Sequence, residues 1–189
     1  MATLKVDKPV AAFLDLIAAS EGTSTNPLTR ADGYDIIVTG VDGPHLFTDF
    51  SVHPFSLGRP PILVRAGKDA TYSSINAGTT GKPIQLTPAV AEVRSTASGR
   101  YQLILPTWEA LCQKYGSRTF SAANQDLAAI QLLSGCGAYD ELLAGQISTA
   151  IDKACETWAS FPGNPYQQGG RSLDWLLTTY DRCLQAQSV

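Results

Sequence analysis

The fold depends first on residues 10–21, which read Val-Ala-Ala-Phe-Leu-Asp-Leu-Ile-Ala-Ala-Ser-Glu. Apolar residues recur in this stretch at the spacing of one helical face, namely at Phe13, Leu14, Ile17 and Ala18. Gly22 follows directly as a stop signal. The pattern predicts a short, largely buried helix that ends at Glu21.

Two candidate strands follow this helix. Residues 34–39 form a β-branched run, and residues 46–50 form a second run after the turn signal Asp42-Gly43-Pro44. Together they predict a small antiparallel hairpin.

From Pro106 onward the pattern becomes helical. We expect helices at about 106–115, 121–134, 137–144, 146–158 and 172–185. Ser121 is a candidate N-cap, and the candidate stops are Gly116, Gly135 and Gly145. Strands that precede a run of helices predict the α+β class, with a small antiparallel β region and a mainly helical lobe.

Residues 54–96 interrupt this layout with five prolines and no clear periodicity. A stretch of this length inside a compact domain is typical of a functional loop, a lid or an inserted β excursion. Short strands are expected at 62–64 and 84–86. We interpret residues 1–189 as a single catalytic domain with a long loop or insertion at about 55–94, which we expect to cover a cleft as a lip.

Composition limits the classes of partner. The 189 residues carry a formal net charge of −3, with no run of lysines or arginines, so nucleic acid is not an expected partner. No apolar run is long enough to cross a bilayer, and no secretory signal precedes the first helix. We therefore expect no stable membrane insertion and synthesis as a soluble cytoplasmic chain.

Metal and cofactor sites are not indicated. The four cysteines are widely spaced, which favours free thiols over zinc ligands or disulfides. His45 and His53 lack a helical metal-binding arrangement, and His53 before Pro54 is interpreted as a structural turn residue. No phosphate-binding loop or nucleophile–base set is present, so no cofactor is expected.

Glu21 is the strongest candidate for chemistry. It stands at the last turn of an apolar helix, where the negative end of the helix dipole disfavours a carboxylate. A carboxyl in such a place tends to hold its proton and can serve as a general acid. On position alone, an ordinary surface glutamate at a fraying helix end is the better interpretation.

Several segments then decide in favour of catalysis. They are residues 12–23, 33–38, 46–51 with His53 and Pro54, 99–103 and 158–163, followed by Tyr166 and Gln167. In this order they resemble the lambda-type phage endolysins, over about residues 12–168. The chain departs from that family at 55–91, where it is longer, and after Gly169, where little resemblance is seen.

The resemblance implies a lysozyme-like α+β fold and lytic transglycosylase activity on the peptidoglycan bond between N-acetylmuramic acid and N-acetylglucosamine. Glu21 would protonate the glycosidic oxygen and later act as base, while the 6-hydroxyl of the sugar attacks and leaves a 1,6-anhydromuramic end. It also implies a monomer that lyses the host, passing from the host cytoplasm to the periplasm after a holin permeabilises the membrane.

Other site residues follow from the same resemblance. Tyr101 and Gln102 are expected beside Glu21, with an aromatic ring to stack on a sugar and an amide to bind one. Without the resemblance, Tyr101 is equally well interpreted as a core residue and Gln102 as a surface residue at a helix entry. Asp35 is expected in the cleft, and Tyr166 and Gln167 on a lip over it.

Two alternatives stay open. A hydrolytic muramidase would need a second carboxylate across the cleft, for which Asp35 and Asp49 are candidates. A catalytically silent wall-binding protein would keep the cleft without its chemistry.

Overall fold

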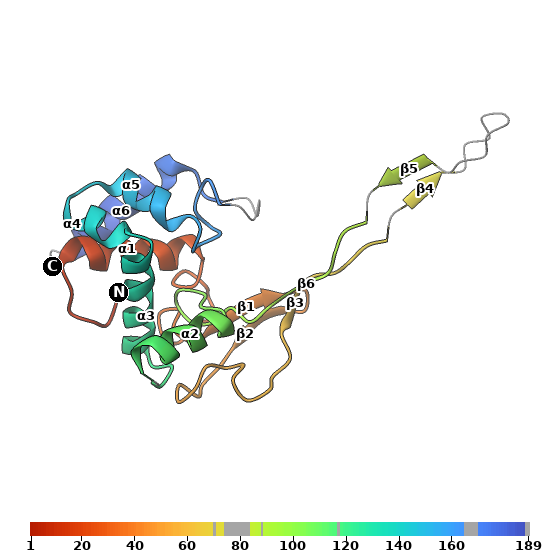
Figure 1. The fold of residues 1–189 in the computed structure, drawn as a ribbon, viewed down its shortest axis with the longest axis horizontal. Helices are drawn as coiled ribbons and strands as arrows, with labels where there is room; N and C mark the ends of the chain where they lie inside the picture. The colour runs from red at the N-terminus through yellow and green to blue at the C-terminus, as the bar shows by residue number, and fades with distance from the viewer. Residues whose placement is uncertain (70, 74–83, 88, 117, 165–169, 188–189) are drawn as a thin grey trace.

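The computed structural model describes residues 1–69, 71–73, 84–87, 89–116, 118–164 and 170–187. Within these ranges it contains six α-helices and three two-stranded antiparallel sheets. The helices gather in one lobe and the strands lie to one side of it (Figure 1). Because strands and helices are segregated instead of alternating, the predicted α+β class is confirmed.

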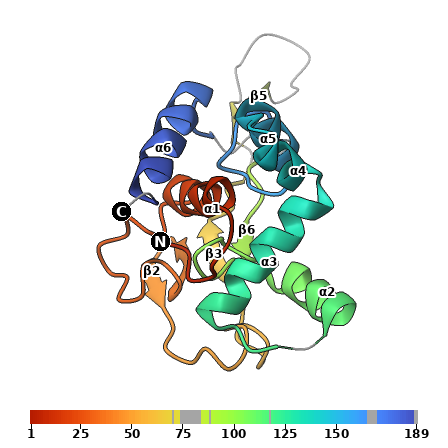
Figure 2. The same cartoon turned by 90° about the vertical axis from the view of Figure 1, so that its left-hand side faces the viewer.

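Helix α1 (Lys8–Ser20) lies in the middle of the helical lobe (Figure 2). Pro9 stands in its first turn, where the missing N–H has no helical partner to lose. Ten of its 13 residues are buried. They pack against α3 (Ala122–Gly135), α4 (Ala138–Leu143) and α6 (Leu173–Ala186). The helix predicted at 10–21 is confirmed to within two residues at each end.

Helices α2 (Leu105–Tyr115) and α5 (Ile147–Ala154) complete the lobe. The predicted N-cap is present, since the Ser121 hydroxyl accepts a hydrogen bond from the N–H of Asn124 at 3.4 Å. Helix α5 ends at Ala154, four residues before the predicted end, because the chain turns there. No helix in the described ranges is long and apolar enough to span a bilayer.

Strands β1 (Ile36–Gly40) and β2 (Gly43–Leu46) form the predicted hairpin, with Gly40 opposite Gly43. The prediction for the second strand is wrong in position, since β2 ends where the strand was expected to begin. The turn consists of residues 41–42, so Pro44 lies inside the strand. An edge strand of a two-stranded sheet accepts proline because an N–H on its open side has no ladder partner.

The long segment after residue 61 forms a two-stranded ribbon, which we call the β arm and define as the described parts of residues 62–95. Strand β3 (Ile62–Arg65) pairs with β6 (Val93–Ser95), and β4 (Thr71–Ser73) pairs with β5 (Ile84–Thr87). An isolated bridge between Lys68 and Val90 lies between the two pairs. The outer pair lies far from the helices (Figure 1). Both predicted strands are confirmed.

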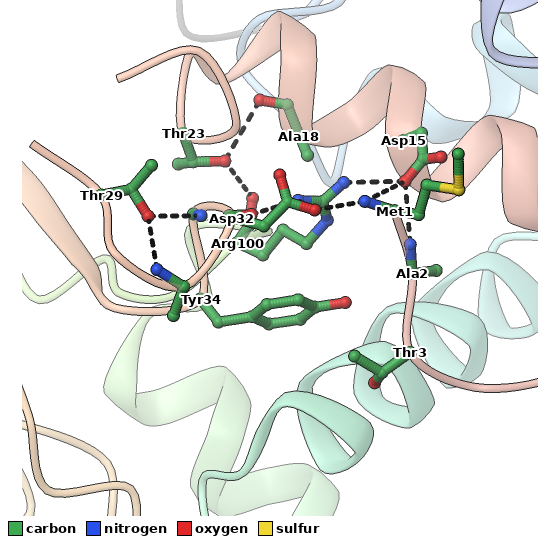
Figure 3. A network of polar contacts seen from close by, with 12 residues as sticks. Met1, Ala2, Thr3, Asp15, Ala18, Thr23, Thr29, Asp32, Tyr34 and Arg100 are labelled. Carbon is green, nitrogen blue, oxygen red and sulfur yellow. Dashed lines mark hydrogen bonds and ion pairs between the residues drawn. The ribbon is translucent and has the colours of Figure 1, made fainter. Parts of the chain in front are cut away.

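Arg100 lies at the centre of a buried polar network (Figure 3). Its residue is only 1% exposed, and its guanidinium contacts Asp15 at 2.7 Å and Asp32 at 3.0 Å. The guanidinium carbon also lies 5.2 Å from the centre of the Tyr34 ring. Thr23 donates a hydrogen bond to the Arg100 carbonyl at 2.6 Å. A buried cation is tolerated only when it is paired, so the network ties α1 to the loops beside it.

Candidate active site

Glu21 forms the C-terminal cap of α1. Its backbone N–H donates to the carbonyl of Ile17 at 2.9 Å, and Gly22 then turns the chain with φ of +73°. The last turn of α1 contains no basic residue, so nothing on the helix offsets the negative end of its dipole. The half-buried Glu21 lines a cleft between the helical lobe and the base of the β arm.

Burial raises the pKa of Glu21, because a carboxylate removed from water loses its hydration. The side chain and backbone of Ser160, and the charge of Arg171, oppose this effect without cancelling it. The net direction is upward. The carboxyl therefore holds its proton at a higher pH than an ordinary glutamate, as a general acid requires.

Two serines extend this carboxyl into a hydrogen-bonded chain. The Ser160 hydroxyl lies 2.7 Å from the Glu21 carboxylate oxygen and 2.9 Å from the Ser20 hydroxyl, which donates to the Ile17 carbonyl at 2.9 Å. When Glu21 is protonated, each hydroxyl can donate one bond and accept one. When Glu21 is ionised, Ser160 donates to it. Ser160 can therefore bond to Glu21 in both protonation states.

The cleft has a volume of about 620 Å³, which is within the usual range of ligand sites. One wall comes from the segment after α5, including Trp158. The opposite wall comes from the base of the β arm, where Val64, Val93 and Arg94 line the cleft. Only the base of the arm meets the expectation of a lip, because β4 and β5 lie away from the helical lobe (Figure 1).

Gln102 is brought to the cleft beside Glu21, as expected. Its backbone adopts φ of +50°, a region that side chains other than glycine rarely occupy, and its amide donates to the Gly99 carbonyl at 3.1 Å. Gly99 itself has φ of +76°, and a Cβ atom there would overlap the side-chain oxygen of Gln125. Strain of this kind is retained where the surrounding contacts impose it, often at functional sites.

Tyr101 lines the same cleft as Glu21, as expected, but its ring is packed into the core. It is 1% exposed, and its hydroxyl donates to buried Asp126 at 2.6 Å, in the same way as the hydroxyl of Tyr34. Its carbonyl accepts the indole N–H of Trp158 at 3.1 Å. The ring is thus held in the core and has no free face for a sugar. Tyr101 is therefore a fixed part of the cleft wall.

Asp35 is also placed differently from the expectation. Its buried carboxylate accepts bonds from the Thr29 hydroxyl at 2.5 Å and the Arg30 N–H at 2.8 Å, and it does not line the cleft. Asp49 is exposed and accepts from the Ser51 N–H at 2.8 Å. These bonds organise the loops around β1 and β2. Neither aspartate faces Glu21 across the cleft.

A carboxylate that the sequence did not single out does line the cleft, namely Glu156 after α5. Only the fold could reveal it, since nothing distinguishes its local sequence from an exposed turn. Tyr166 and Gln167 lie outside the described residues.

His53 has the structural role that was predicted. Its Nε2 lies 3.0 Å from the Leu103 carbonyl, and its Nδ1 accepts from the Phe55 N–H at 3.3 Å. Burial lowers the pKa of this imidazole. The four cysteines are free and partly buried. No group of three or more potential metal ligands occurs in the part of the chain that the structure describes.

A helical lobe set against a small β region, with a proton-holding glutamate in the cleft beside both, defines a lysozyme-like glycosidase. Comparison with solved structures agrees with this class. Bacteriophage lambda lysozyme complexed with a chitohexasaccharide superimposes with a TM-score of 0.70 at 31% identity, covering 96% of this chain and 97% of that one. A second structure of the lambda lysozyme gives a TM-score of 0.61 at 29% identity.

The chain belongs to the endolysin family, since the family model described as Endolysin matches residues 11–185. The endolysin of Escherichia phage P2 is 40% identical over 182 residues, covering 95% of each chain. The endolysin of Escherichia phage lambda is 35% identical over 170 residues, covering 89% of this chain and 87% of the relative. The protein is thus a peptidoglycan-degrading endolysin. The family match includes α6, where little resemblance was expected.

Proposed function

We propose that this endolysin is a lytic transglycosylase that cleaves the β-1,4 bond between N-acetylmuramic acid and N-acetylglucosamine. The observation that carries the proposal is Glu21, a carboxyl with a raised pKa in a cleft that neither Asp35 nor Asp49 lines. A hydrolase needs a second carboxylate to activate water or form an intermediate. A transglycosylase needs one, because its nucleophile belongs to the substrate.

The reaction starts with Glu21 protonated. Its proton passes to the glycosidic oxygen as that bond breaks, and the 6-hydroxyl of the muramic acid attacks the anomeric carbon. The ionised Glu21 then accepts the proton of that hydroxyl, so the group ends as it began and no water is consumed. Ser160 donates to the carboxylate while it is charged, which lowers the energy of the intermediate stage.

Substrate contacts are part of the proposal. Gln102, which lines the cleft with Glu21, is assigned to binding the glycan. Tyr166 and Gln167 are assigned to a lip over the same strand, on the strength of the family pattern alone. We further propose that the enzyme acts as a monomer and reaches the periplasm from the host cytoplasm through a holin-permeabilised membrane.

One observation favours hydrolysis as the second candidate, namely Glu156 in the same cleft. If its carboxylate activates a water on the far side of the sugar, the enzyme is an inverting muramidase, and if the carboxylate itself attacks the sugar, a retaining one. Mass spectrometry of digested peptidoglycan separates the two reactions, since anhydro ends are lighter than reducing ends by one water. Products with reducing ends alone would overturn the transglycosylase proposal, and loss of those ends in E156Q would assign the base.

The E21Q variant tests catalysis itself. It removes the transferable proton and nearly preserves shape, so we expect lytic activity to fall by about 10² to 10⁴. Equal lysis by E21Q and the wild type would show that another group is the catalyst. If E21Q still sediments with cell walls, the substitution has removed catalysis and not binding. A wild type without lytic activity would instead favour the alternative of a catalytically silent wall-binding protein.

A further inference from the structure

The β arm begins at the wall of the active-site cleft. Val64 on β3 and Val93, Arg94 and Ser95 on β6 line the same cleft as Glu21. The N–H of Val41, next to β1, bonds to the Leu63 carbonyl at 2.8 Å and fixes the base of the arm to the body. A polymer that runs through the cleft therefore passes the base of the arm.

Beyond its base the arm has little to hold it. Lys68 and Val90 exchange two backbone hydrogen bonds of 2.8 Å, and β4 pairs with β5, but no third strand joins either pair in the described ranges. A two-stranded ribbon is marginally stable in water and buries little core. The arm therefore contributes little to the stability of the fold, which points to a role in contact with something else.

The charge of this segment is opposite to that of the rest of the chain. Residues 62–95 contain four basic and two acidic side chains, a net charge of +2, whereas the whole chain carries −3 and the remainder therefore −5. Arg65 and Lys68 are exposed, and no carboxylate among the described residues pairs with either. Arg94 is bonded to Glu92 at 2.6 Å. The uncompensated cations thus lie just outward of the cleft wall.

We propose that the β arm is a second substrate-binding surface, which uses Arg65 and Lys68 to hold the carboxylates of the stem peptides attached to the glycan strand in the cleft. The inference rests on the proposed function, since it takes a peptidoglycan strand as the occupant of the cleft. Stem peptides are the acidic part of that polymer, and they branch from its muramic acid residues. Peptides on sugars beside the cleavage site leave the cleft where the arm begins.

The same cations could in principle attract an anionic membrane surface. The position of the arm favours the stem peptides, because its base and the catalytic cleft share one wall, so a ligand of the arm and a glycan in the cleft are adjacent. Exposed cations act mainly through charge, so the contact should weaken with added salt.

The test compares the double variant R65Q/K68Q with the wild type on two substrates, intact peptidoglycan and glycan strands freed of their peptides by an amidase. The matched control is K5Q/K8Q, which removes the same charge at the N-terminal end of α1, where both lysines are exposed and far along the helix from Glu21. We expect R65Q/K68Q to lose about threefold to tenfold activity on intact peptidoglycan at low salt and to match the wild type on bare glycan.

Three results would overturn the proposal: no loss on intact peptidoglycan, an equal loss on both substrates, or an equal loss in K5Q/K8Q. If R65Q/K68Q adsorbs to anionic vesicles less than the wild type does but digests peptidoglycan equally well, the arm binds membranes instead. Thermal unfolding of each variant confirms that it is folded. The mass of the released ends tests the transglycosylase reaction separately, since it depends on which bond is formed and not on the rate.

Discussion

The hydroxyl of Ser160 should set the pH at which the enzyme loses activity. In S160A the carboxylate of Glu21 loses a bond of 2.7 Å, while burial, the dominant cause of the raised pKa, remains. A hydrogen bond to a charged group is worth about 1.5–3 kcal/mol and one between neutral groups about 0.5–1.5 kcal/mol, so the bond from Ser160 stabilises the ionised form of Glu21 more than the protonated form. Removing it therefore raises the pKa of Glu21 further.

The sign of the effect on activity follows from the role of the acid. Glu21 is active while protonated, so activity is present below its folded pKa and is lost as the pH rises through it. The basic limb of the activity profile should move to higher pH in S160A. S160T keeps the hydroxyl and should leave the limb close to that of the wild type.

The assay is the initial rate of peptidoglycan digestion by each variant across the pH range at constant ionic strength. A limb in S160A that stays in place or moves to lower pH would refute the reasoning. A uniform loss of rate at every pH, with the limb unmoved, would instead mean that Ser160 only positions the carboxyl.

Three further outcomes are expected. E21Q should stabilise the fold by about 0.5–2 kcal/mol at neutral pH and by less below the ordinary pKa of glutamate. The reason is that a raised pKa in the folded state lowers stability only at a pH where the carboxyl of the unfolded chain is ionised. Urea unfolding at two pH values checks this. G99A should cost about 3 kcal/mol or more in the same assay, because the new methyl group overlaps Gln125 and φ is positive. Q102G and Q102A should both weaken glycan binding, measured as a higher KM. Q102A should also be less stable than Q102G by about 1 kcal/mol, because only glycine accepts φ of +50° without strain.

The helices were predictable because their signals are local. The apolar run of α1, the serine cap of α3 and the glycines after the helices act within a few residues, so their ends were found closely. The position of β2 was missed for the converse reason. Pro44 was interpreted as part of a turn, although an edge strand tolerates proline, and only the pairing of Gly40 with Gly43 shows where the turn lies.

The site was predictable only in part. Glu21, Tyr101 and Gln102 line the cleft, but a sequence pattern does not tell a residue that contacts sugar from one that supports the wall. Tyr101 supports the wall through its buried hydrogen bond to Asp126, and Asp35 holds the loop before β1 through its bond from the Arg30 N–H. Ser160 was part of a quoted segment, yet its contact with Glu21 joins residues 139 apart in the chain, and no local signal reports it.

The β arm leaves the body at Ile62 and returns at Ser95, and these two residues are paired on one rung of the same ladder. Because Ile62 and Ser95 are paired, the two ends of the arm lie side by side on the body. Lengthening, shortening or exchanging the chain between Arg65 and Glu92 should leave the helical lobe, Glu21 and the cleft residues Val64 and Val93 in place. Changes in this segment can therefore alter substrate binding without altering the catalytic carboxyl, and a foreign binding hairpin can be grafted at the same position.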